Sequence, residues 1–299
     1  MLITLKELSG KNIKMKKIIV LGALGMAGHI MSEYLDSLNE YEVLGVARTE
    51  GKLIHKVIDV SNFSDLEEYL NKVKPDFVIN CIGILVQQSK DNLSTAILIN
   101  SYLPHFLAEL GKQLNYKLIQ ISTDCVYSGK DGQYTENSFR DGDDNYARTK
   151  ALGEVINDKD LTIRTSIIGP GLKTNSTGLL DWFFKQSVEV KGYTKAYWTG
   201  VTTLELAKAT HQFIQQNITG LYHLCPEHKI SKFDLLKIFA KVWHKEIRII
   251  PFADYTVDKS LVCTRTDFKY IRHDYLTMLN ELKAWVDNHP TYYTDSYKQ

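Results

Sequence analysis

The sequence predicts an α/β protein in which a doubly wound parallel sheet is followed by a smaller C-terminal α/β lobe. Two observations support this class. Short, continuous apolar runs, typical of strands buried on both faces, alternate with helix-like segments as far as Gly169. Beyond Gly169 the alternation weakens, and helical segments are separated by short strands. We therefore expect an N-terminal extension over 1–14, a sheet domain over 15–169, and a lobe over 170–299 that folds over one edge of the sheet and is interleaved with it.

The strands of the sheet are expected where short apolar runs end in turns or polar residues. These segments are 18–21, 42–47, a strand ending near Asp59, 77–82, 117–122 and 161–166. Pro75 lies just before the fourth of them and closes the preceding connection. Strands separated by helical segments build βαβ units, so the sheet should be parallel with helices on both faces.

Helical periodicity fills the intervals between these strands. The expected helices run from the glycine-rich turn after the first strand to residue 38, then over 92–114, 146–156, 178–188, 203–216, 231–243 and 275–286. Ser64 and Glu67 are spaced as a capping box for one more helix, which ends near Val73. Pro104 is expected to kink the long helix, and Thr202 or Thr203 to cap the helix over 203–216.

Composition excludes several classes of protein. Lys and Arg number 36 against 35 Asp and Glu, a net charge of +1, which indicates neither a nucleic-acid nor an anionic-membrane partner. No apolar run approaches the roughly 18 residues of a membrane-spanning helix. The cysteines at 81, 125, 225 and 263 lie far apart, which favours free thiols in the cytoplasm. The nine histidines lack ligand spacing, so we expect no metal site.

Residues 1–14 precede the first strand and contain neither a motif nor the pattern of a secretory signal. Met15 would be an ordinary start for a domain of this kind. We therefore expect a chain that begins at Met15 to fold and to keep full activity; the alternative is an added helix that packs on the lobe.

Gly22, Gly25 and Gly28 form G-x-x-G-x-x-G between the first strand and the first helix. The first glycine permits a tight turn, the second lets the backbone approach a pyrophosphate, and the third lets the helix pack closely on the strand. The N–H groups at the start of the helix would then face the phosphates. The pattern predicts a Rossmann-type dinucleotide site over the first part of the chain, although a turn that only packs a helix would look the same.

The end of the second strand distinguishes the two nicotinamide cofactors. An acidic residue at this position would bind the 2′-hydroxyl of NAD, but the strand ends with Ala47 and Arg48. A guanidinium pairs bidentately with phosphate, so NADP(H) is the expected cofactor and NAD(H) the alternative. The other interpretation of Arg48 is a solvated surface residue. Asp59 and Val60, at the end of the third strand, are candidates to contact the adenine, with a helix-preceding cap as the alternative for Asp59.

Tyr146 and Lys150 form Y-x-x-x-K on a predicted helix, which places both side chains on one face. A nearby ammonium favours the phenolate, so the pair can pass a proton to or from a carbonyl oxygen. Such pairs also occur by chance on surfaces. Ser122, Thr123 and Asp124 end the preceding strand, where a hydroxyl can hydrogen-bond the same carbonyl.

Together these residues resemble the extended short-chain dehydrogenase/reductase family, and within it the dTDP-4-dehydrorhamnose reductase-like sugar-nucleotide reductases. The segments that carry the resemblance are Gly22-Ala-Leu-Gly-Met-Ala-Gly28, Ser122-Thr-Asp-Cys-Val-Tyr-Ser-Gly129, Tyr146-Ala-Arg-Thr-Lys-Ala-Leu-Gly-Glu154, Arg164-Thr-Ser166 and Gly200-Val-Thr-Thr-Leu-Glu-Leu-Ala207. The resemblance covers residues 17–286, nearly the whole chain.

The resemblance implies a function for individual residues. Thr123, Tyr146 and Lys150 would be the catalytic triad. The cofactor would contact Gly22, Gly25, Met26, Ala27, Gly28, Arg48, Asp59, Val60, Cys81, Ile82, Gly83, Tyr146 and Lys150. Of these, Cys81, Ile82 and Gly83 would lie at the ribose on the nicotinamide side. The substrate would contact Thr123, Asp124, Ile167 and Thr202.

The chain departs from the family pattern at three positions. Met26 stands where Gln is usual, Ile167 where Trp is frequent, and Thr202 where Pro is usual. Since Ile167 offers no flat surface or N–H donor, we expect a nucleotide sugar related to the usual dTDP-linked one, such as a UDP-linked 2-acetamido sugar.

Aromatic residues of the lobe offer a further set of candidates. Tyr193, Tyr197 and Trp198 are either lining of a nucleotide-sugar pocket or simple packing residues. Trp182, with Phe183 and Phe184 beside it, is expected in the core or at the lobe interface rather than in a stacking platform.

The leading expectation is an NADPH-dependent reductase of a nucleotide-linked 4-keto-6-deoxysugar, serving cell-surface polysaccharide synthesis, with a homodimer among the family's options. A 4,6-dehydratase would carry Thr-Asp-Glu where this chain has Thr123, Asp124 and Cys125. A 4-epimerase needs only the triad and a tightly held NAD, which Arg48 disfavours. A regulatory subunit without catalysis, as the same branch contains, would keep the nucleotide site but could lose the triad, which is present here.

Overall fold

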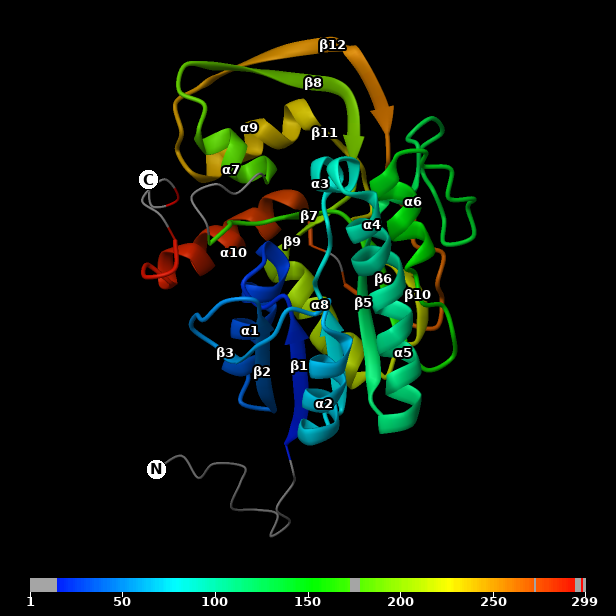
Figure 1. Cartoon of the computed structure of the whole chain (residues 1–299). Helices are drawn as coiled ribbons and strands as arrows, with labels where there is room; N and C mark the ends of the chain where they lie inside the picture. The colour runs from blue at the N-terminus through cyan, green and yellow to red at the C-terminus, as the bar shows by residue number, and fades with distance from the viewer. Residues whose placement is uncertain (1–14, 173–177, 272, 294–296, 298–299) are drawn as a thin grey trace.

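A seven-stranded parallel sheet forms the centre of the molecule (Figure 1). The computed structural model describes residues 15–172, 178–271, 273–293 and 297. The strands of the large sheet follow the order β10-β6-β5-β4-β1-β2-β3. These strands are β1 (Lys16–Leu21), β2 (Tyr41–Ala47), β3 (Ile54–Val57), β4 (Phe77–Asn80), β5 (Lys117–Thr123), β6 (Leu161–Thr165) and β10 (Gly220–His223). The expected doubly wound parallel sheet is therefore confirmed, and all the strands expected for it are present.

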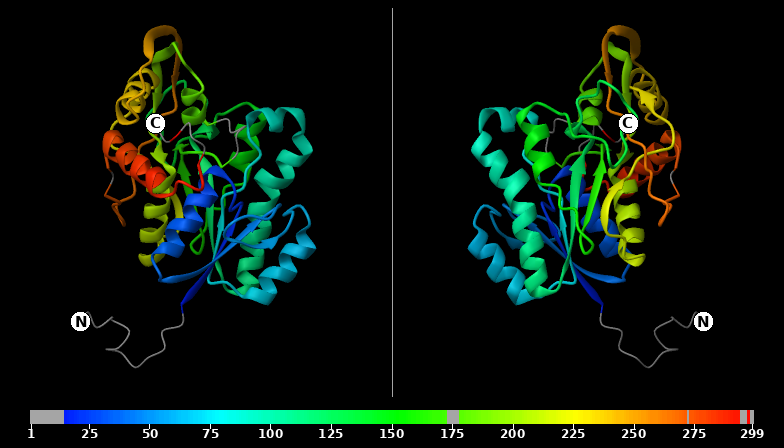
Figure 2. Two further views of the ribbon diagram at one scale, coloured as in Figure 1. Left: turned by 90° about the vertical axis from the view of Figure 1, so that its left-hand side faces the viewer. Right: turned by 90° about the vertical axis from the view of Figure 1, so that its right-hand side faces the viewer.

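Helices cover both faces of this sheet, as the two side views show (Figure 2). α1 (Met26–Ser37) and α8 (Thr203–Gln215) lie on one face, and α2 (Phe63–Val73) and α5 (Leu103–Leu114) on the other. The side chains of β1 alternate between the two cores: Ile18 and Val20 belong to the first, Ile19 and Leu21 to the second. All four are fully buried, which explains the uninterrupted apolar run in the sequence.

The long helix expected over 92–114 is built from three pieces. α4 (Leu93–Ala96) leads into a π-helical segment, η2 (Ile97–Tyr102), and then into α5. Pro104 lies in the first turn of α5 and lacks the N–H that a regular helix would use there. At the position where we expected a kink, the chain therefore changes from π-helix to α-helix. Asn100, in the π segment, accepts from the Ile84 N–H at 2.8 Å and donates to the Thr149 hydroxyl at 3.1 Å, which ties the segment to α6 (Asn145–Leu152).

Several helix boundaries differ from the predicted ones; the helix expected over 178–188, for example, ends at Phe184. Asn62 rather than Ser64 caps α2, because its side-chain oxygen accepts from the Asp65 N–H at 3.3 Å; the expected capping box is wrong. α6 ends at Leu152, four residues before the predicted end. A Cβ on the next residue, Gly153, would lie 1.8 Å from the carbonyl oxygen of Asn100, so only glycine fits against the π segment there.

The lobe is centred on a second, three-stranded sheet in the order β11-β8-β12. Its elements are α7 (Leu179–Phe184), β8 (Glu189–Trp198), β11 (Ile230–Ser231), α9 (Lys232–Val242) and β12 (Arg248–Asp258). In Figure 1 these elements lie above the carboxyl ends of the large sheet, rather than over one edge as expected. The second half also adds β10 to the edge of the large sheet, so the two halves are interleaved.

Five further strands and helices complete the described part of the chain. They are α3 (Val86–Asp91), η3 (Asp124–Val126), the paired short strands β7 (Ile167–Ile168) and β9 (Val201–Thr202), and α10 (Tyr275–Asn288). In the part of the chain that is described, no helix has the length and apolar character needed to cross a membrane. Residues 1–14, for which we expect no role, lie outside the described residues.

Candidate functional site

The glycine-rich turn follows β1 at the carboxyl end of the sheet, where ligands of open α/β sheets bind. Gly22 has a φ of +79°, which side chains disfavour, and its carbonyl accepts from the Gly25 N–H at 2.8 Å. A Cβ on Gly28 would lie 2.1 Å from that same carbonyl oxygen. The sequence therefore needs glycine at both positions to bring α1 against β1.

The start of α1 is suited to an anion. Gly25 is the N-cap residue, and no side chain of the described residues caps the helix. The N–H groups of Met26 and Ala27 belong to the first turn, which has no partners within the helix. These N–H groups and the helix dipole fit a pyrophosphate. The turn thus has the geometry that a dinucleotide requires.

Two residues expected at the adenosine half of the cofactor lie beyond the ends of β2 and β3. Arg48 directly follows β2 and is exposed, and Asp59 follows β3 and is also exposed. The Asp59 carboxylate accepts from the Ser61 N–H at 3.0 Å and from its hydroxyl at 2.8 Å, and these bonds, with Arg48, lower the Asp59 pKa. Asp59 therefore orders the turn before α2, while Val60 beside it is buried.

The run of Cys81, Ile82 and Gly83 follows β4 on the other side of β1. The Cys81 N–H donates to the Leu21 carbonyl at 3.1 Å, and the Ile82 N–H to the Asn80 side chain at 3.1 Å. Burial raises the pKa of the Cys81 thiol to about 12, although Lys150 opposes this shift. Cys81 therefore lies next to Lys150 as an un-ionised thiol.

Thr123, Tyr146 and Lys150 come together where β5 ends beside α6. The Thr123 hydroxyl accepts from the Cys125 N–H at 3.1 Å, and a hydrogen bond with Thr123 lowers the Tyr146 pKa, although burial raises it by more. The Lys150 ammonium donates to the Ile121 carbonyl at 2.8 Å, and burial lowers its pKa to about 8. The net shift of Tyr146 is upward, so the pKa lowering that we expected from Lys150 is not what the structure shows.

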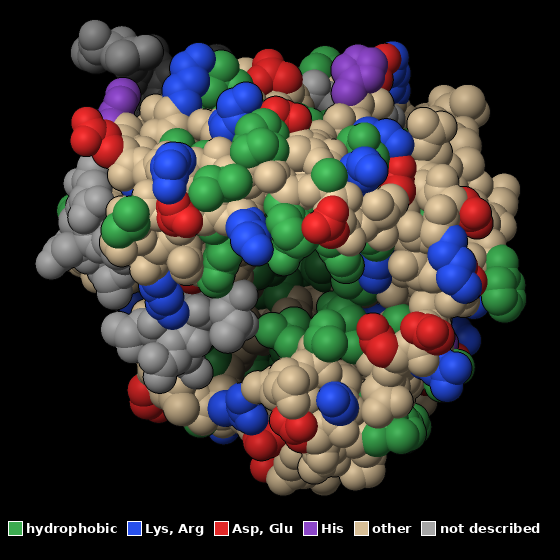
Figure 3. Space-filling view, turned by 90° about the horizontal axis from the view of Figure 1, so that it is seen from above, with side chains coloured by type: hydrophobic (Ala, Val, Ile, Leu, Met, Phe, Trp, Pro, Cys, Tyr) green, Lys and Arg blue, Asp and Glu red, His purple; other side chains and the backbone are tan. Residues whose placement is uncertain are grey.

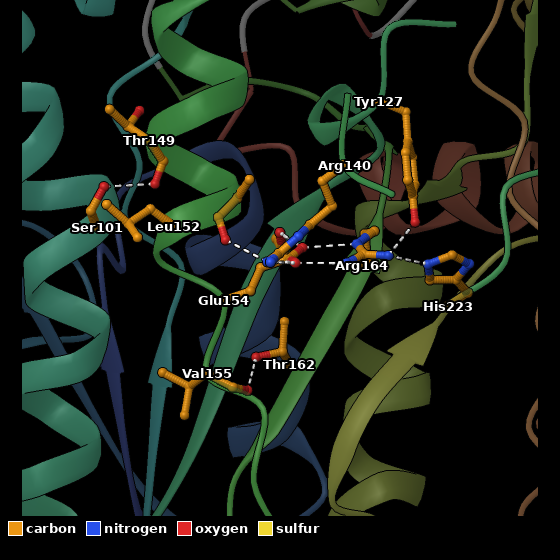
Figure 4. Close-up of polar contacts among 12 residues, drawn as sticks. Ser101, Tyr127, Arg140, Thr149, Leu152, Glu154, Val155, Thr162, Arg164 and His223 are labelled. Atoms are coloured by element: carbon orange, nitrogen blue, oxygen red, sulfur yellow. Dashed lines mark hydrogen bonds and ion pairs between the residues drawn. The ribbon is translucent and has the colours of Figure 1, made fainter. Parts of the chain in front are cut away.

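A buried network of polar side chains lies next to this site and links β6 to the residues that follow α6 (Figure 4). Glu154 accepts two hydrogen bonds from the Arg164 guanidinium, at 2.8 and 2.6 Å, and one from the Ser122 hydroxyl at 2.7 Å. Arg164 in turn reaches the Tyr127 hydroxyl at 2.5 Å and His223 at 2.8 Å. Three of the sequence segments singled out above, those at 122–129, 146–154 and 164–166, are thus joined through side chains.

A cavity of about 510 Å³ lies between this site and the lobe. It is lined by Asp124, Cys125, Ser166, Leu179, Trp182, Lys191, Tyr193, Ala196, Tyr197, Trp198, Lys232, Leu236, Tyr255, Val257 and Lys259. The face seen from above is hollowed, with hydrophobic side chains around the hollow (Figure 3). The large aromatic share suits a flat ring, and the three lysines suit an anion.

Only some of the residues expected to contact the substrate line the cavity. Asp124 lines it, and so do Tyr193, Tyr197 and Trp198, for which packing was the alternative. Trp182 also lines it and is 40% exposed, so our placement of Trp182 in the core or interface is wrong. Phe183 and Phe184 beside it are buried in the main core.

Three residues expected to contact the substrate are not part of the described cavity lining: Thr123, which ends β5 next to Asp124, and Thr202 and Ile167. Thr202 is buried, and its hydroxyl accepts from the Glu205 N–H at 3.1 Å as the cap of α8. Ile167 packs against the main core. Neither is part of the described cavity lining; in the structure Ile167 is a packing residue, and Thr202 is the cap of α8, which confirms one of the two residues expected there.

Sequence analysis missed the lysines at 191, 232 and 259 and the Tyr255 ring. Lys191 and Tyr193 lie two residues apart on β8, so a period-two pattern could have placed them on one face. Burial raises the Asp124 pKa, and Lys259 and Lys232 oppose that shift. Burial also lowers the pKa of Lys232, and Asp124 opposes this shift in turn. The charge of Asp124 at the cavity wall is therefore coupled to the charges of Lys232 and Lys259.

A separate group of ligand-type residues lies by α8 and α10. Donor atoms of Glu205, His273 and Glu281 all lie within 4.8 Å of one another, a group that histidine spacing does not reveal. Its members are engaged with neighbours: Glu205 accepts from the Tyr270 hydroxyl at 3.0 Å, and Glu281 pairs with Lys208 at 2.8 Å. This group contributes no residue to the cavity lining.

Comparison with known proteins gives consistent results. A family model described as the RmlD substrate binding domain matches residues 15–260. A dTDP-4-dehydrorhamnose reductase of Aggregatibacter actinomycetemcomitans is 28% identical over 158 residues, which is 51% of this chain and 51% of that enzyme. The spore coat polysaccharide biosynthesis protein SpsK of Bacillus subtilis (strain 168) is 26% identical over 70% of this chain and 73% of its own.

The fold likewise matches solved structures. A dTDP-4-dehydrorhamnose reductase of Bacillus anthracis str. Ames, in complex with NADP, superposes with a TM-score of 0.80. It is 18% identical, and the match covers 91% of this chain and 99% of that one. At this identity the likeness establishes the fold, which is the Rossmann-type α/β fold predicted from the sequence.

Proposed function

Because the chain belongs to the RmlD substrate binding domain family, we propose that it is an NADPH-dependent reductase of the C4 ketone of a nucleotide-linked 4-keto-6-deoxysugar. The observation that carries the proposal is the meeting of Thr123, Tyr146 and Lys150 beside a cavity of about 510 Å³ with aromatic and lysine walls. The reaction takes place in the cytoplasm and supplies cell-surface polysaccharide synthesis. The enzyme acts alone or as a homodimer.

In the proposed reaction, individual residues of the chain have separate roles. A reduced nicotinamide held by the glycine-rich turn would supply a hydride to the carbonyl carbon. The Tyr146 hydroxyl then gives its proton to the carbonyl oxygen, and the Thr123 hydroxyl donates a hydrogen bond to that oxygen. The high pKa of Tyr146 keeps the proton in place until negative charge develops on the oxygen. Hydride and proton together would convert the ketone to a secondary alcohol, with the oxidised nicotinamide as the second product.

The rival dehydratase reaction requires a base where this chain has Cys125. Burial raises the pKa of the Cys125 thiol to about 12, with Asp124 adding to the shift. A thiol that stays protonated cannot remove the C5 proton of a sugar. The reductase is therefore the better assignment, and the presence of all three triad residues favours it over a regulatory subunit without catalysis.

The cofactor preference can be tested at Arg48. We expect Arg48→Asp to raise the KM for NADPH by about tenfold or more, the scale of a lost charge-assisted hydrogen bond, and to lower the KM for NADH. Because the 2′ position is remote from the hydride, kcat should change little. Steady-state kinetics with each cofactor measure this. Lys72→Asp, in the last turn of α2, is the matched charge reversal and should change neither KM. Unchanged values for Arg48→Asp would make Arg48 a surface residue only.

The anion-binding part of the cavity can be tested at Lys232. Lys232→Met keeps the length of the side chain and removes its charge, so we expect the KM for the nucleotide sugar to rise by about 10- to 100-fold. Lys237→Met on the same helix is the control, because Lys237 lies outside the cavity and pairs with Asp234 at an exposed position. Equal KM values for Lys232→Met and the wild type would contradict an anionic group at this wall.

The deciding experiment offers dTDP- and UDP-linked 4-keto-6-deoxyhexoses with NADPH and identifies the product by mass and NMR. The proposal expects NADPH oxidation and a C4 alcohol with at least one of them. The two residues behind our expectation of a UDP-linked sugar lie outside the described cavity lining, so a tenfold preference in kcat/KM decides between the nucleotides. No oxidation with any keto sugar would overturn the reductase assignment.

A further inference from the structure

The C-terminal segment 291–293 lies against the glycine-rich turn, although the two are at opposite ends of the chain. With Ala23 and Leu24 of the turn, Thr291 and Tyr292 enclose a cavity of about 230 Å³. The segment follows α10, and both lie beyond residue 260, where the match to the family model ends.

A directed set of hydrogen bonds runs from α10 to the turn. The Trp285 indole N–H donates to the Tyr293 hydroxyl at 3.2 Å, and that hydroxyl lies 3.1 Å from Nε2 of His29. Nδ1 of His29 lies 2.8 Å from the carbonyl oxygen of Gly25. Since a carbonyl can only accept, Nδ1 carries the hydrogen, and Nε2 must accept from Tyr293. Burial lowers the His29 pKa to about 4, so the ring is neutral, as this arrangement requires.

A second contact joins the same segment to the loop after β2. The Tyr292 hydroxyl donates to the Glu33 carboxylate at 2.5 Å. The Lys52 ammonium lies 4.3 Å from the centre of the Tyr292 ring and 3.7 Å from Glu33. Lys52 follows Arg48 by four residues in that loop. The segment thus touches both parts of the chain that would hold the phosphates of the cofactor.

From these contacts we infer that Tyr293 and His29 are positioning residues for the dinucleotide, because they fix the carbonyl of Gly25. Gly25 is the N-cap residue of α1, so the orientation of its peptide unit sets the direction of the N–H groups that follow it. A turn that is already fixed binds without the further cost of ordering its backbone. The inference rests on the proposed function, since the dinucleotide site comes from it.

The test is Tyr293→Phe in the full-length protein, with NADPH binding measured directly by titration of the cofactor's fluorescence. Loss of one buried hydrogen bond should raise the Kd for NADPH by about two- to tenfold. The kcat at saturating NADPH should stay within about twofold of the wild type, because His29 and Tyr293 act on binding before the chemical step. Tyr116→Phe is the matched control: its hydroxyl donates to the Leu107 carbonyl at 2.6 Å, at the amino end of β5 and far from the turn.

The outcomes separate the two levels of the proposal. A wild-type protein that binds neither NADPH nor NADH would overturn both the proposed function and this inference. A wild-type protein that binds NADPH, with Tyr293→Phe binding it equally well, would overturn the inference alone. An equal rise in Kd for Tyr116→Phe would also overturn it, because any loss of stability would then weaken the site. A rise confined to Tyr293→Phe supports it.

Discussion

Replacing Tyr146 with phenylalanine is expected to lower kcat by about 100-fold or more without unfolding the protein. The ring keeps its volume but loses the one proton that the site can deliver to the carbonyl oxygen, and general acids contribute on the order of 10²- to 10⁴-fold. The Thr123 hydroxyl remains beside the ring in the variant, so some electrostatic stabilisation persists. NADPH oxidation under saturating keto sugar measures the loss.

Two controls separate this effect from damage to the fold. Tyr102→Phe removes a hydroxyl from a side chain that is 53% exposed, and it should leave kcat unchanged. The Kd of Tyr146→Phe for NADPH should rise by no more than a few fold, since the phenyl ring keeps its place beside the cofactor and only one hydroxyl is lost. Turnover by Tyr146→Phe at nearly the wild-type rate would remove Tyr146 from the mechanism.

Replacing Glu154 with glutamine is expected to lower the free energy of unfolding by about 3–5 kcal/mol, the usual cost of removing one partner from a buried ion pair. Both side chains are essentially inaccessible, at 0% exposure for Glu154 and 1% for Arg164. Burial alone would raise the Glu154 pKa, but Arg164, Ser122 and Arg140 together outweigh it, and the net shift is downward. The variant leaves that guanidinium buried with its charge unbalanced.

Chemical denaturation of both proteins measures this difference. Glu109→Gln, which breaks an exposed pair with Lys112, is the control and should not change the midpoint detectably. A second variant, Glu154→Gln with Arg164→Met, should recover part of the lost stability because the unbalanced charge is gone. If Glu154→Gln unfolds at the same denaturant concentration as the wild type, the network does not stabilise the fold.

The sheet and the conformation of the glycine-rich turn were predictable because local patterns determine them. A strand buried on both faces must be apolar throughout, as at 18–21, and a turn with a positive φ must use glycine, as at Gly22. The Tyr146–Lys150 spacing likewise depends only on helical geometry. Glu154 and Arg164 were both noted in the sequence as parts of separate motifs. That their side chains pair becomes clear only when β5, β6 and α6 are assembled.

The substrate side was not predictable because distant segments create it. Lys191 on β8, Lys232 on α9 and Lys259 after β12 meet only through the packing of the lobe. The cap of α8 depends on local sequence alone, and the structure confirms Thr202 as that cap, one of the two residues expected for it. The cap of α2 was misplaced by two residues. Asn62 and Ser64 are both residue types that favour the N-cap, and both lie at the start of the same helical pattern, so the sequence does not distinguish them.

The pairing of β8 with β12 has a consequence for the order in which the protein is made. Glu189 on β8 pairs with Arg248 on β12, 59 positions later in the chain. During synthesis from the N-terminus, the glycine-rich turn, Tyr146 and Lys150 all leave the ribosome well before β12 does. A nascent chain can therefore contain all seven strands of its large sheet while the wall that carries Tyr255 and Lys259 does not yet exist. The segment 291–293, which contacts the glycine-rich turn, is made later still, so a polypeptide cut short before residue 248 lacks part of both proposed sites.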